Sequence, residues 1–489
     1  MGKFINPADK LVCTIGSLCA THNADAFGRS AAILRSSRRT QQNETVGESD
    51  VVARASEAEC IPDYTAQVED VAFAKVAWRL LPILVVAFTL NFLDRTNVGV
   101  AALTMNEDVG LSASQFGLGS GLFFLGYCLF DVPSNLLLYR FGARIWLSRI
   151  MLTWGIVSAA TIFVTGPYSF YLVRFLLGIA EAGFFPGVAF YLSAWFPKAS
   201  RAKILTWFLV AIPASSLIGS PLSGLLLEMD GVAGLAGWKW LLVIEALPTI
   251  VVGLLLLKAL ADGPEKAKWL TGAERLAIVR RLDNERSEQA HHSLHRLMPA
   301  LRDIRVLLLA GVFLALSIGS FGVQIWLPLI IKHEQQHFSN LMIGFISAIP
   351  FLFATAAMVI WAVIGSRRGS MAGNVIITCV LASIGFAGAL IPGSFLLSMT
   401  GITIALIGMN ASRGFFWAIP SQFLTGVAAA GGIAFINMVG VAGGFIGPWL
   451  MGSLKDLTGS FEVGLAGLGG SLLIAAMLVV VLKRRLQSD

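Results

Sequence analysis

Charged residues are scarce in this sequence. Asp, Glu, Lys and Arg make up 13% of its 489 residues, whereas soluble domains carry about 25%. A soluble chain of this length would fold as two or three domains, and each would need a charged surface. The composition therefore excludes an ordinary soluble enzyme.

Motifs of enzymes and metal sites are also lacking. The sequence has five cysteines, and their spacing predicts neither a disulfide framework nor a metal site. No P-loop, dinucleotide-binding or hydrolase motif occurs in a usable context. We therefore expect no enzymatic activity, no cofactor and no metal, and we interpret His291, His292 and His295 as linker residues.

Long apolar runs are what the sequence does contain. Hydrophobic residues make up 56% of the chain and the mean hydropathy is +0.75. Runs of about 20 apolar residues are long enough to cross the roughly 30 Å hydrocarbon core of a membrane. Twelve such runs occur, near 78–100, 115–138, 145–165, 168–194, 202–227, 239–261, 304–331, 340–365, 371–392, 395–418, 424–452 and 461–483. The sequence predicts an all-α membrane protein with twelve transmembrane helices.

Two polar stretches divide the chain. Residues 1–75 mix polar and charged residues without periodicity, so we expect a disordered tail. Residues 262–303 carry both charge signs and are expected to be partly helical around 272–288. They separate two six-helix halves, 76–261 and 304–485, in the parallel-repeat layout of many transporters.

The distribution of basic residues predicts the orientation. Lys and Arg gather in the loops after even-numbered spans, in 262–303 and at the C-terminus, whereas the opposite loops hold few. Because positively charged loops stay in the cytoplasm, we expect both termini and the 262–303 segment to be cytoplasmic.

Few ionisable residues lie inside the spans, and such residues are functional candidates by default because burying a charge in lipid is costly. The first span contains Asp94 and Arg95, and the fourth contains Arg174 and Glu181. Asp94 and Arg174 each lie about 9 Å from the outer edge, so they share a depth and could pair. Glu181 lies two turns beyond Arg174 on the same helix face.

These four charges predict a coupling device. They sum to zero, and protonation of Glu181 leaves one positive charge for a substrate carboxylate. An arginine can hold a carboxylate with two parallel hydrogen bonds. The alternative is a pair of static ion bridges that join the first and fourth spans.

Weaker candidates lie elsewhere in the spans. Tyr127, Trp417 and Asn437 could line a substrate cavity, with core packing as the equal alternative. Arg413 lies near the cytoplasmic end of the tenth span, where we favour snorkelling to the interface. Glu245, near the outer end of the sixth span, is interpreted as structural.

Four segments carry a family resemblance. Residues 91–97, 126–135, 174–187 and 237–240 closely resemble motifs of the anion:cation symporter family of the major facilitator superfamily. The resemblance covers about residues 76–485. It implies the major facilitator fold and a proton-driven importer of organic anions in the cell inner membrane, working by alternating access.

The resemblance also implies roles for residues at matching positions. Asp94 and Glu181 match proton-coupling carboxylates, and Arg95 and Arg174 match arginines that bind the substrate carboxylate. The matching cavity-lining positions are Tyr127, Trp417 and Asn437.

The sequence leaves the substrate open. The aromatic segment 414–417 slightly favours an aromatic or weakly hydroxylated carboxylate. We expect a monomer that interacts with this small anion, protons and the lipid bilayer, and not with nucleic acid. Two alternatives are a proton-driven exporter of an organic anion or drug and a non-transporting sensor with a transporter fold.

Overall fold

The computed structural model describes residues 48–289, 302–366, 370–391, 393–424 and 426–488. The three linker histidines lie outside these ranges. The chain divides into two units, Met1–Ala66 and Gln67–Asp489, and the architecture below is that of the second unit. All regular secondary structure in the described ranges is helical, which confirms the predicted all-α fold class.

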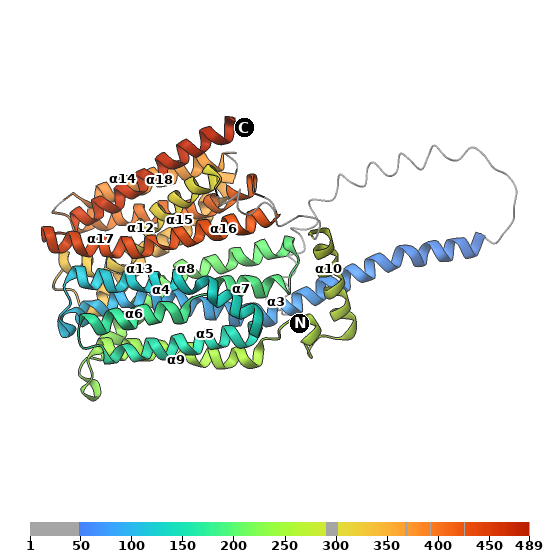
Figure 1. Ribbon diagram of the computed structural model, residues 1–489, viewed down its shortest axis with the longest axis horizontal. Helices are drawn as coiled ribbons and strands as arrows, with labels where there is room; N and C mark the ends of the chain where they lie inside the picture. The colour runs from blue at the N-terminus through green and yellow to red at the C-terminus, as the bar shows by residue number, and fades with distance from the viewer. Residues whose placement is uncertain (1–47, 290–301, 367–369, 392, 425, 489) are drawn as a thin grey trace, which may run out of the picture. The chain divides into compact units, whose positions relative to one another are not determined.

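The first half consists of long helices (Figure 1). They are α3 (Glu48–Val109), α4 (Ala113–Phe141), α5 (Ala143–Ala160), α6 (Pro167–Glu181) with α7 (Phe184–Ser193), α8 (Lys198–Leu227) and α9 (Gly237–Ala259). The fourth span is broken into α6 and α7. Because α3 begins at Glu48, residues 48–75 of the expected tail are helical, and residues 1–47 lie outside the described part.

The second half repeats the arrangement. Its spans are α12 (Ile304–Glu334), α13 (Asn340–Ser366), α14 (Met371–Ala389), α15 (Phe395–Ala418), α16 (Gly426–Val441) with α17 (Gly443–Thr458), and α18 (Glu462–Ser488). Between the halves lie a short 3-10 helix, Pro264–Lys266, and α10 (Gly272–Gln289). The position of α10 agrees with the helix expected over 272–288.

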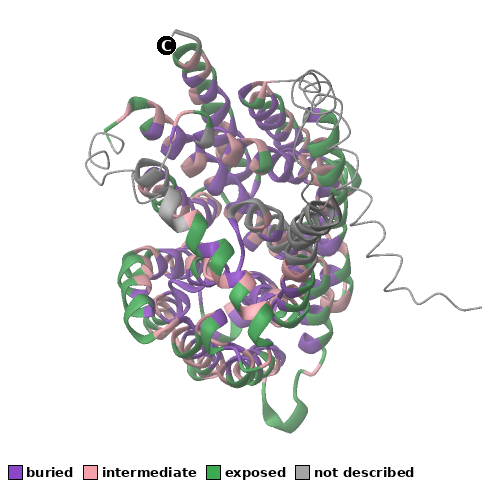
Figure 2. Cartoon of the chain, turned by 90° about the vertical axis from the view of Figure 1, so that its right-hand side faces the viewer, coloured by how far each residue is buried: buried purple, intermediate pink, exposed green. Residues whose placement is uncertain are grey.

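Length and hydropathy fit a membrane protein. Within the described residues, 11 helices are long and apolar enough to span a bilayer. The twelfth span is α8, which has 30 residues and includes the apolar stretch Ala214–Leu227. Figure 2 shows that buried residues lie where helices face one another and that exposed residues lie on the outer faces. Large apolar side chains such as Leu136, Leu396 and Met477 are among the exposed ones, as expected for contact with lipid.

The two halves touch closely at one end of the bundle. We call it the closed end; it carries residues 110–112, 228–236, 335–339 and 459–461. Here α4 packs on α17 and α8 packs on α13. A Cβ atom added at Gly117 would collide with the carbonyl oxygen of Pro448, and one added at Gly452 would collide with that of Ala113. The halves therefore meet backbone to backbone, as small residues allow in membranes.

Two acidic side chains connect the halves at the closed end. Asp456, near the end of α17, accepts hydrogen bonds from the backbone N–H groups of Ala113 (3.1 Å) and Ser114 (2.7 Å), which begin α4. Glu228, just after α8, accepts one from the N–H of Leu341 (3.2 Å), near the start of α13. Each acid satisfies N–H groups that a helix start leaves unpaired. We call these contacts the two caps of the closed end.

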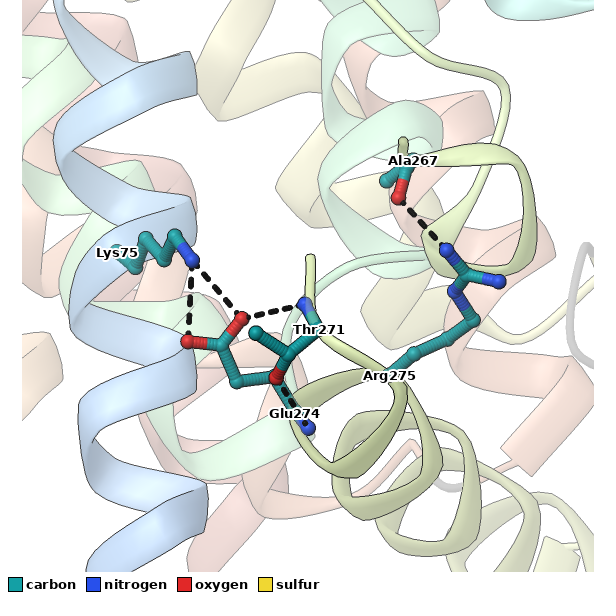
Figure 3. A network of polar contacts seen from close by, with 5 residues as sticks. All are labelled: Lys75, Ala267, Thr271, Glu274 and Arg275. Carbon is teal, nitrogen blue, oxygen red and sulfur yellow. Dashed lines mark hydrogen bonds and ion pairs between the residues drawn. The ribbon is translucent and has the colours of Figure 1, made fainter. Parts of the chain in front are cut away.

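At the opposite end, the segment between the halves binds the first half (Figure 3). Lys75 Nζ on α3 lies 2.9 and 3.1 Å from the two carboxylate oxygens of Glu274 on α10. The same carboxylate accepts the N–H of Thr271 at 2.8 Å, and Arg275 donates to the carbonyl oxygen of Ala267 at 3.1 Å. The N–H of Thr271 and the ammonium of Lys75 lower the pKa of Glu274. The start of α10 is therefore fixed to α3.

Candidate functional site

A buried polar turn of α3 begins the site. Asp94 is 3% exposed and accepts hydrogen bonds from Asn97 Nδ2 (2.8 Å) and Ser158 Oγ (3.1 Å). Trp154 Nε1 donates to its second oxygen. Since Trp154 and Ser158 belong to α5, the Asp94 carboxylate faces α5. Asp94 and Arg174, which share a depth and could pair, are near enough to interact electrostatically, but no direct ion pair joins them in the described part.

A second buried carboxylate shares a donor with Asp94. Asn97 Nδ2 also lies 3.0 Å from Glu245 on α9, and Ser223 Oγ of α8 donates to the other oxygen of Glu245 at 2.7 Å. Glu245 is 3% exposed. The residue that we interpreted as structural is therefore linked to Asp94 through one amide group. Depth along the sixth span alone gave no sign of this link.

Arg95 and Glu181 form the ion pair of the site. Nε of Arg95 lies 2.6 Å from Oε1 of Glu181, and its Nη2 contacts the same oxygen. The guanidinium lies against aromatic rings, with its Cζ 4.9 Å from the centre of Tyr127 and 5.0 Å from that of Phe92. Cations are attracted to such ring faces. The structure thus brings together Arg95, Glu181 and Tyr127, three of the candidate site residues.

Several polar atoms around this pair are buried and unpartnered. They are Oε2 of Glu181, Nε and Nη2 of Arg174, and both side-chain polar atoms of Asn91, none of which has a hydrogen-bond partner in the described part. Arg174 is 3% exposed, and its guanidinium lies 5.0 Å from the ring centre of Phe123. Buried polar groups normally have partners. The arrangement therefore leaves donors and acceptors free for water or for a ligand.

The fourth span breaks directly after Glu181. Gly183 has φ of +83°, a conformation that glycine adopts easily and other residues rarely do. Its N–H donates to Oδ1 of Asp131 on α4 at 3.1 Å. Sequence analysis missed Asp131 as a candidate, although it is an acidic residue inside the second apolar run. The broken helix thus binds a fourth carboxylate of the first half, after those of Asp94, Glu245 and Glu181.

Trp417 and Asn437 are the second-half residues that we expected to line the cavity. Trp417 is half-buried and packs edge-on against Phe313 and Phe416, with ring centres 5.0 and 5.2 Å apart. Asn437 on α16 is partly exposed. Next to it, the carbonyl oxygen of Met438 accepts the thiol of Cys128 on α4 at 3.7 Å. Because Cys128 follows Tyr127, this contact brings the two halves together beside the site.

Arg413 does not lie at the interface as expected. It lines a narrow cavity between the halves with residues of α8, α12, α13 and α15, namely Ile212, Ser216, Ser320, Gln324, Phe351, Leu406 and Asn410. The Cβ of a helical residue tilts toward the start of its helix, and α15 starts at the closed end. A long side chain at Arg413 therefore extends into the bundle and not out toward the nearer interface.

The comparisons with known proteins agree with this architecture. A family model described as Major Facilitator Superfamily matches residues 84–448. A protein of Agrobacterium vitis, provisionally assigned as a tartrate transporter, is 47% identical over 420 residues, or 86% of this chain and 93% of the relative. A quinolone resistance transporter of Acinetobacter baumannii is 40% identical over 419 residues, or 84% of this chain and 95% of the relative.

The solved structures give the same fold. A bacterial homologue of the human lysosomal transporter Spinster, in an inward-facing and occupied conformation, covers 83% of this chain and 96% of its own. The TM-score is 0.67 at 16% sequence identity. The chain belongs to the major facilitator superfamily and is a multi-pass membrane transporter, not an enzyme.

Proposed function

We propose that this protein is a proton-coupled secondary transporter of the cell inner membrane that imports a small organic anion by alternating access. The proposal is carried by one observation: the buried guanidinium of Arg174, with two unpartnered nitrogens, lies near the Arg95–Glu181 pair. A buried cation with free donors requires an anion, and a carboxylate matches the planar geometry of a guanidinium.

The proton controls which anion Arg95 holds. When Glu181 is ionised, its carboxylate occupies Nε and Nη2 of Arg95. Protonation removes that charge, so that Arg95 is released and can join Arg174 in binding a substrate carboxylate. Loss of the proton restores the Arg95–Glu181 pair and expels the anion. Proton and anion thus bind together and leave together, as symport requires.

Asp94 is the second coupling carboxylate in this proposal. Three neutral donors surround it, from Asn97, Trp154 and Ser158, and no cation pairs with it in the described part. Its protonation would break hydrogen bonds with α5 and, through Asn97, alter the contact with Glu245. Asp94 therefore connects a proton to the packing of α3 on α5 and α9.

The charge distribution supports an orientation in the membrane that lets substrate leave to the cytoplasm. If positively charged loops are cytoplasmic, both termini and the 262–303 segment lie in the cytoplasm, and the closed end faces outward. The structure then corresponds to the state from which substrate leaves to the cytoplasm. Alternation would open the closed end, where the two halves meet through glycines and the two caps.

Uptake into proteoliposomes tests the proposal. Labelled mono- and dicarboxylates, aliphatic and aromatic, are offered with an acidic exterior, and the wild type is expected to concentrate at least one of them. A protonophore should abolish the accumulation and leave exchange intact. Liposomes with the Glu181→Gln, Arg174→Ala double variant are the matched control. Failure to bind or transport any carboxylate would overturn the proposal.

Export is the second candidate, and one relative favours it. The Acinetobacter baumannii relative that is 40% identical is described as a quinolone resistance transporter. An exporter driven by proton antiport would expel an anion or drug when protons enter. The same proteoliposomes distinguish the two: an acidic exterior drives accumulation by an importer but accelerates loss of preloaded substrate from an exporter.

A further inference from the structure

We propose that Arg413 binds a second carboxylate of the substrate, so that the transported anion is a small dicarboxylate held between the two halves. This inference rests on the proposed function and names its substrate class. The starting observation is an uncompensated cation: Arg413 makes no hydrogen bond or ion pair in the described part of the chain, and no acidic side chain lies against it.

An arginine within the span of a membrane helix is costly unless an anion or water compensates it. Among the arginines of the first-half site, Arg95 is compensated by Glu181. Arg413 has no such partner among the described residues of the second half. Since its charge is permanent, deprotonation offers no relief. Water or an anion from outside the chain must therefore compensate it. The cavity beside Arg413 has a volume of about 10 Å³, room for a water molecule, so it would widen when a substrate anion takes the place of that water.

Arg413 lies at the depth of the first-half site. Ser394 and Phe395, at the start of α15, line a cavity of about 390 Å³ with the closed-end residue Phe461. Along α15, Arg413 is about 27 Å from that start, and its side chain extends back by about one turn, or 5 Å. Arg95 is about 21 Å from the closed end along α3, and because α3 ends there, the same tilt carries its side chain away from that end to about 26 Å. The two guanidinium groups thus lie within about one helical turn of each other in depth, on opposite halves.

The surroundings of Arg413 suit an anion with further polar groups. The cavity is lined by polar side chains of both halves: Asn410 and Ser320 from the second half and Ser216 from the first. Gln324 Nε2 of α12 donates to Ser216 Oγ of α8 at 3.2 Å, which joins the halves on the closed-end side of the cavity. One carboxylate bound by Arg95 and Arg174 and another by Arg413 would link the halves through the substrate.

The test compares dicarboxylates with their half-amides, which differ by one charge and little in shape. Binding of succinate, tartrate and phthalate, each paired with its monoamide, is measured on purified wild-type protein by isothermal titration calorimetry at acidic pH. At least one dicarboxylate is expected to bind about 10- to 100-fold more tightly than its half-amide, the usual effect of one charge-assisted contact. Arg413→Gln should reduce that ratio to near one while the half-amide affinity stays within about twofold.

Two control variants keep the test specific. Arg413→Lys retains the charge and should preserve part of the ratio. Arg149→Gln removes another arginine with a buried Nε. Arg149 lies outside the site, with its guanidinium 4.1 Å from the ring centre of Trp146. This variant should leave the affinity ratio unchanged. Thermal unfolding of each variant identifies any variant that fails to fold. If Arg413→Gln fails to fold, the affinity ratio measured for Arg413→Lys decides the inference.

The outcomes separate the two proposals. Equal binding of dicarboxylate and half-amide by the wild type would overturn the role of Arg413 and leave carboxylate transport intact. An equal loss of both ligands in Arg413→Gln would do the same. Absence of binding by every acid and half-amide would instead overturn the proposed function, and the inference with it.

Discussion

Nε of Arg95 lies 2.6 Å from Oε1 of Glu181, while Oε2 of the same carboxylate is buried and accepts no hydrogen bond of normal geometry from the described residues. The carboxylate therefore holds Arg95 through one oxygen and keeps the other available to a proton. Such one-sided pairing allows Glu181 to be protonated without first leaving its position. It is the geometric basis of the coupling proposed here.

Glu181→Gln should separate binding from coupling. The amide is uncharged, so Arg95 stays available to the substrate, but it cannot carry the proton. Counterflow exchange should remain within about twofold of wild type, whereas accumulation driven by a pH gradient should disappear. Glu462→Gln, which changes an exposed carboxyl, is the control. Wild-type accumulation in Glu181→Gln would leave Asp94 as the proton carrier.

Arg174→Lys should weaken substrate binding by about tenfold or more although the charge is kept. A compact ammonium cannot reproduce the two parallel donors of a guanidinium, and in Arg174 two nitrogens are free for that contact. Equilibrium binding of the transported acid to purified protein measures the effect. Arg149→Lys serves as the matched control, and an unchanged affinity in Arg174→Lys would reassign Arg174 to a structural role.

Gly183→Ala should destabilise the first half. The residue has φ of +83°, and an added Cβ would collide with the hydroxyl of Ser134. A non-glycine residue in this conformation costs about 1 kcal/mol or more, which should lower the melting temperature by about 2–4 °C or more. Gly166→Ala is the control, since a Cβ there meets nothing within 4 Å. Equal melting temperatures of Gly183→Ala and Gly166→Ala would contradict the strain expected at the break after Glu181.

Docking of α10 should depend on pH. The backbone N–H of Thr271, together with Lys75, lowers the pKa of Glu274 from the ordinary value of 4.5. Because the pKa of Glu274 is lower when α10 is docked, the ionised carboxylate contributes fully to docking above about pH 4.5. This contribution is lost as the pH falls through the lowered pKa. The protection factors of the α10 amides, which correct for the slower intrinsic exchange in acid, should therefore fall as the pH is lowered.

Glu274→Gln provides the test at neutral pH. It should give low protection factors in α10 already at pH 7, and acid should then lower them little further. Glu265→Gln, in an exposed position of the same segment, should behave as wild type. If the protection factors in Glu274→Gln fall with acid as steeply as in wild type, the contact with Lys75 does not hold α10.

Asp456→Ala should make the closed end open more often. Removing a carboxylate that accepts two N–H groups at a helix start costs about 1 kcal/mol, which corresponds to a roughly fivefold change in population. The distance between spin labels at Val232 and His337, one in each half, is measured by double electron–electron resonance. Asp456→Ala should show a larger fraction of long distances than the wild type. A distance distribution like that of wild type, with Glu462→Gln as reference, would show that the cap contributes nothing.

Hydropathy predicted most of the fold because the spacing of apolar runs is set by membrane thickness. Depth along each helix was also predictable, and it indicated that Asp94 and Arg174 could pair. The direction in which a side chain points around its helix axis was not predictable. Asp94 is near enough to Arg174 to interact electrostatically, but its carboxylate points to α5 and accepts hydrogen bonds from Trp154 and Ser158.

Other residues were misjudged for different physical reasons. The distance of Arg413 from the cytoplasmic end of its span suggested snorkelling, but its side chain leans toward the start of its helix. Asp131 was missed because its partner, the N–H of Gly183, becomes available only where the fourth span breaks. No hydropathy pattern marks that break, since both sides of it are equally apolar.

The two caps of the closed end have a consequence for the way the protein switches. One acid belongs to the second half and holds a helix of the first, and the other belongs to the first half and holds a helix of the second. A rigid-body rotation that separates the halves must pull on both contacts at once. Opening is therefore expected to be all-or-none, with no stable half-open form in which one acid still holds its helix.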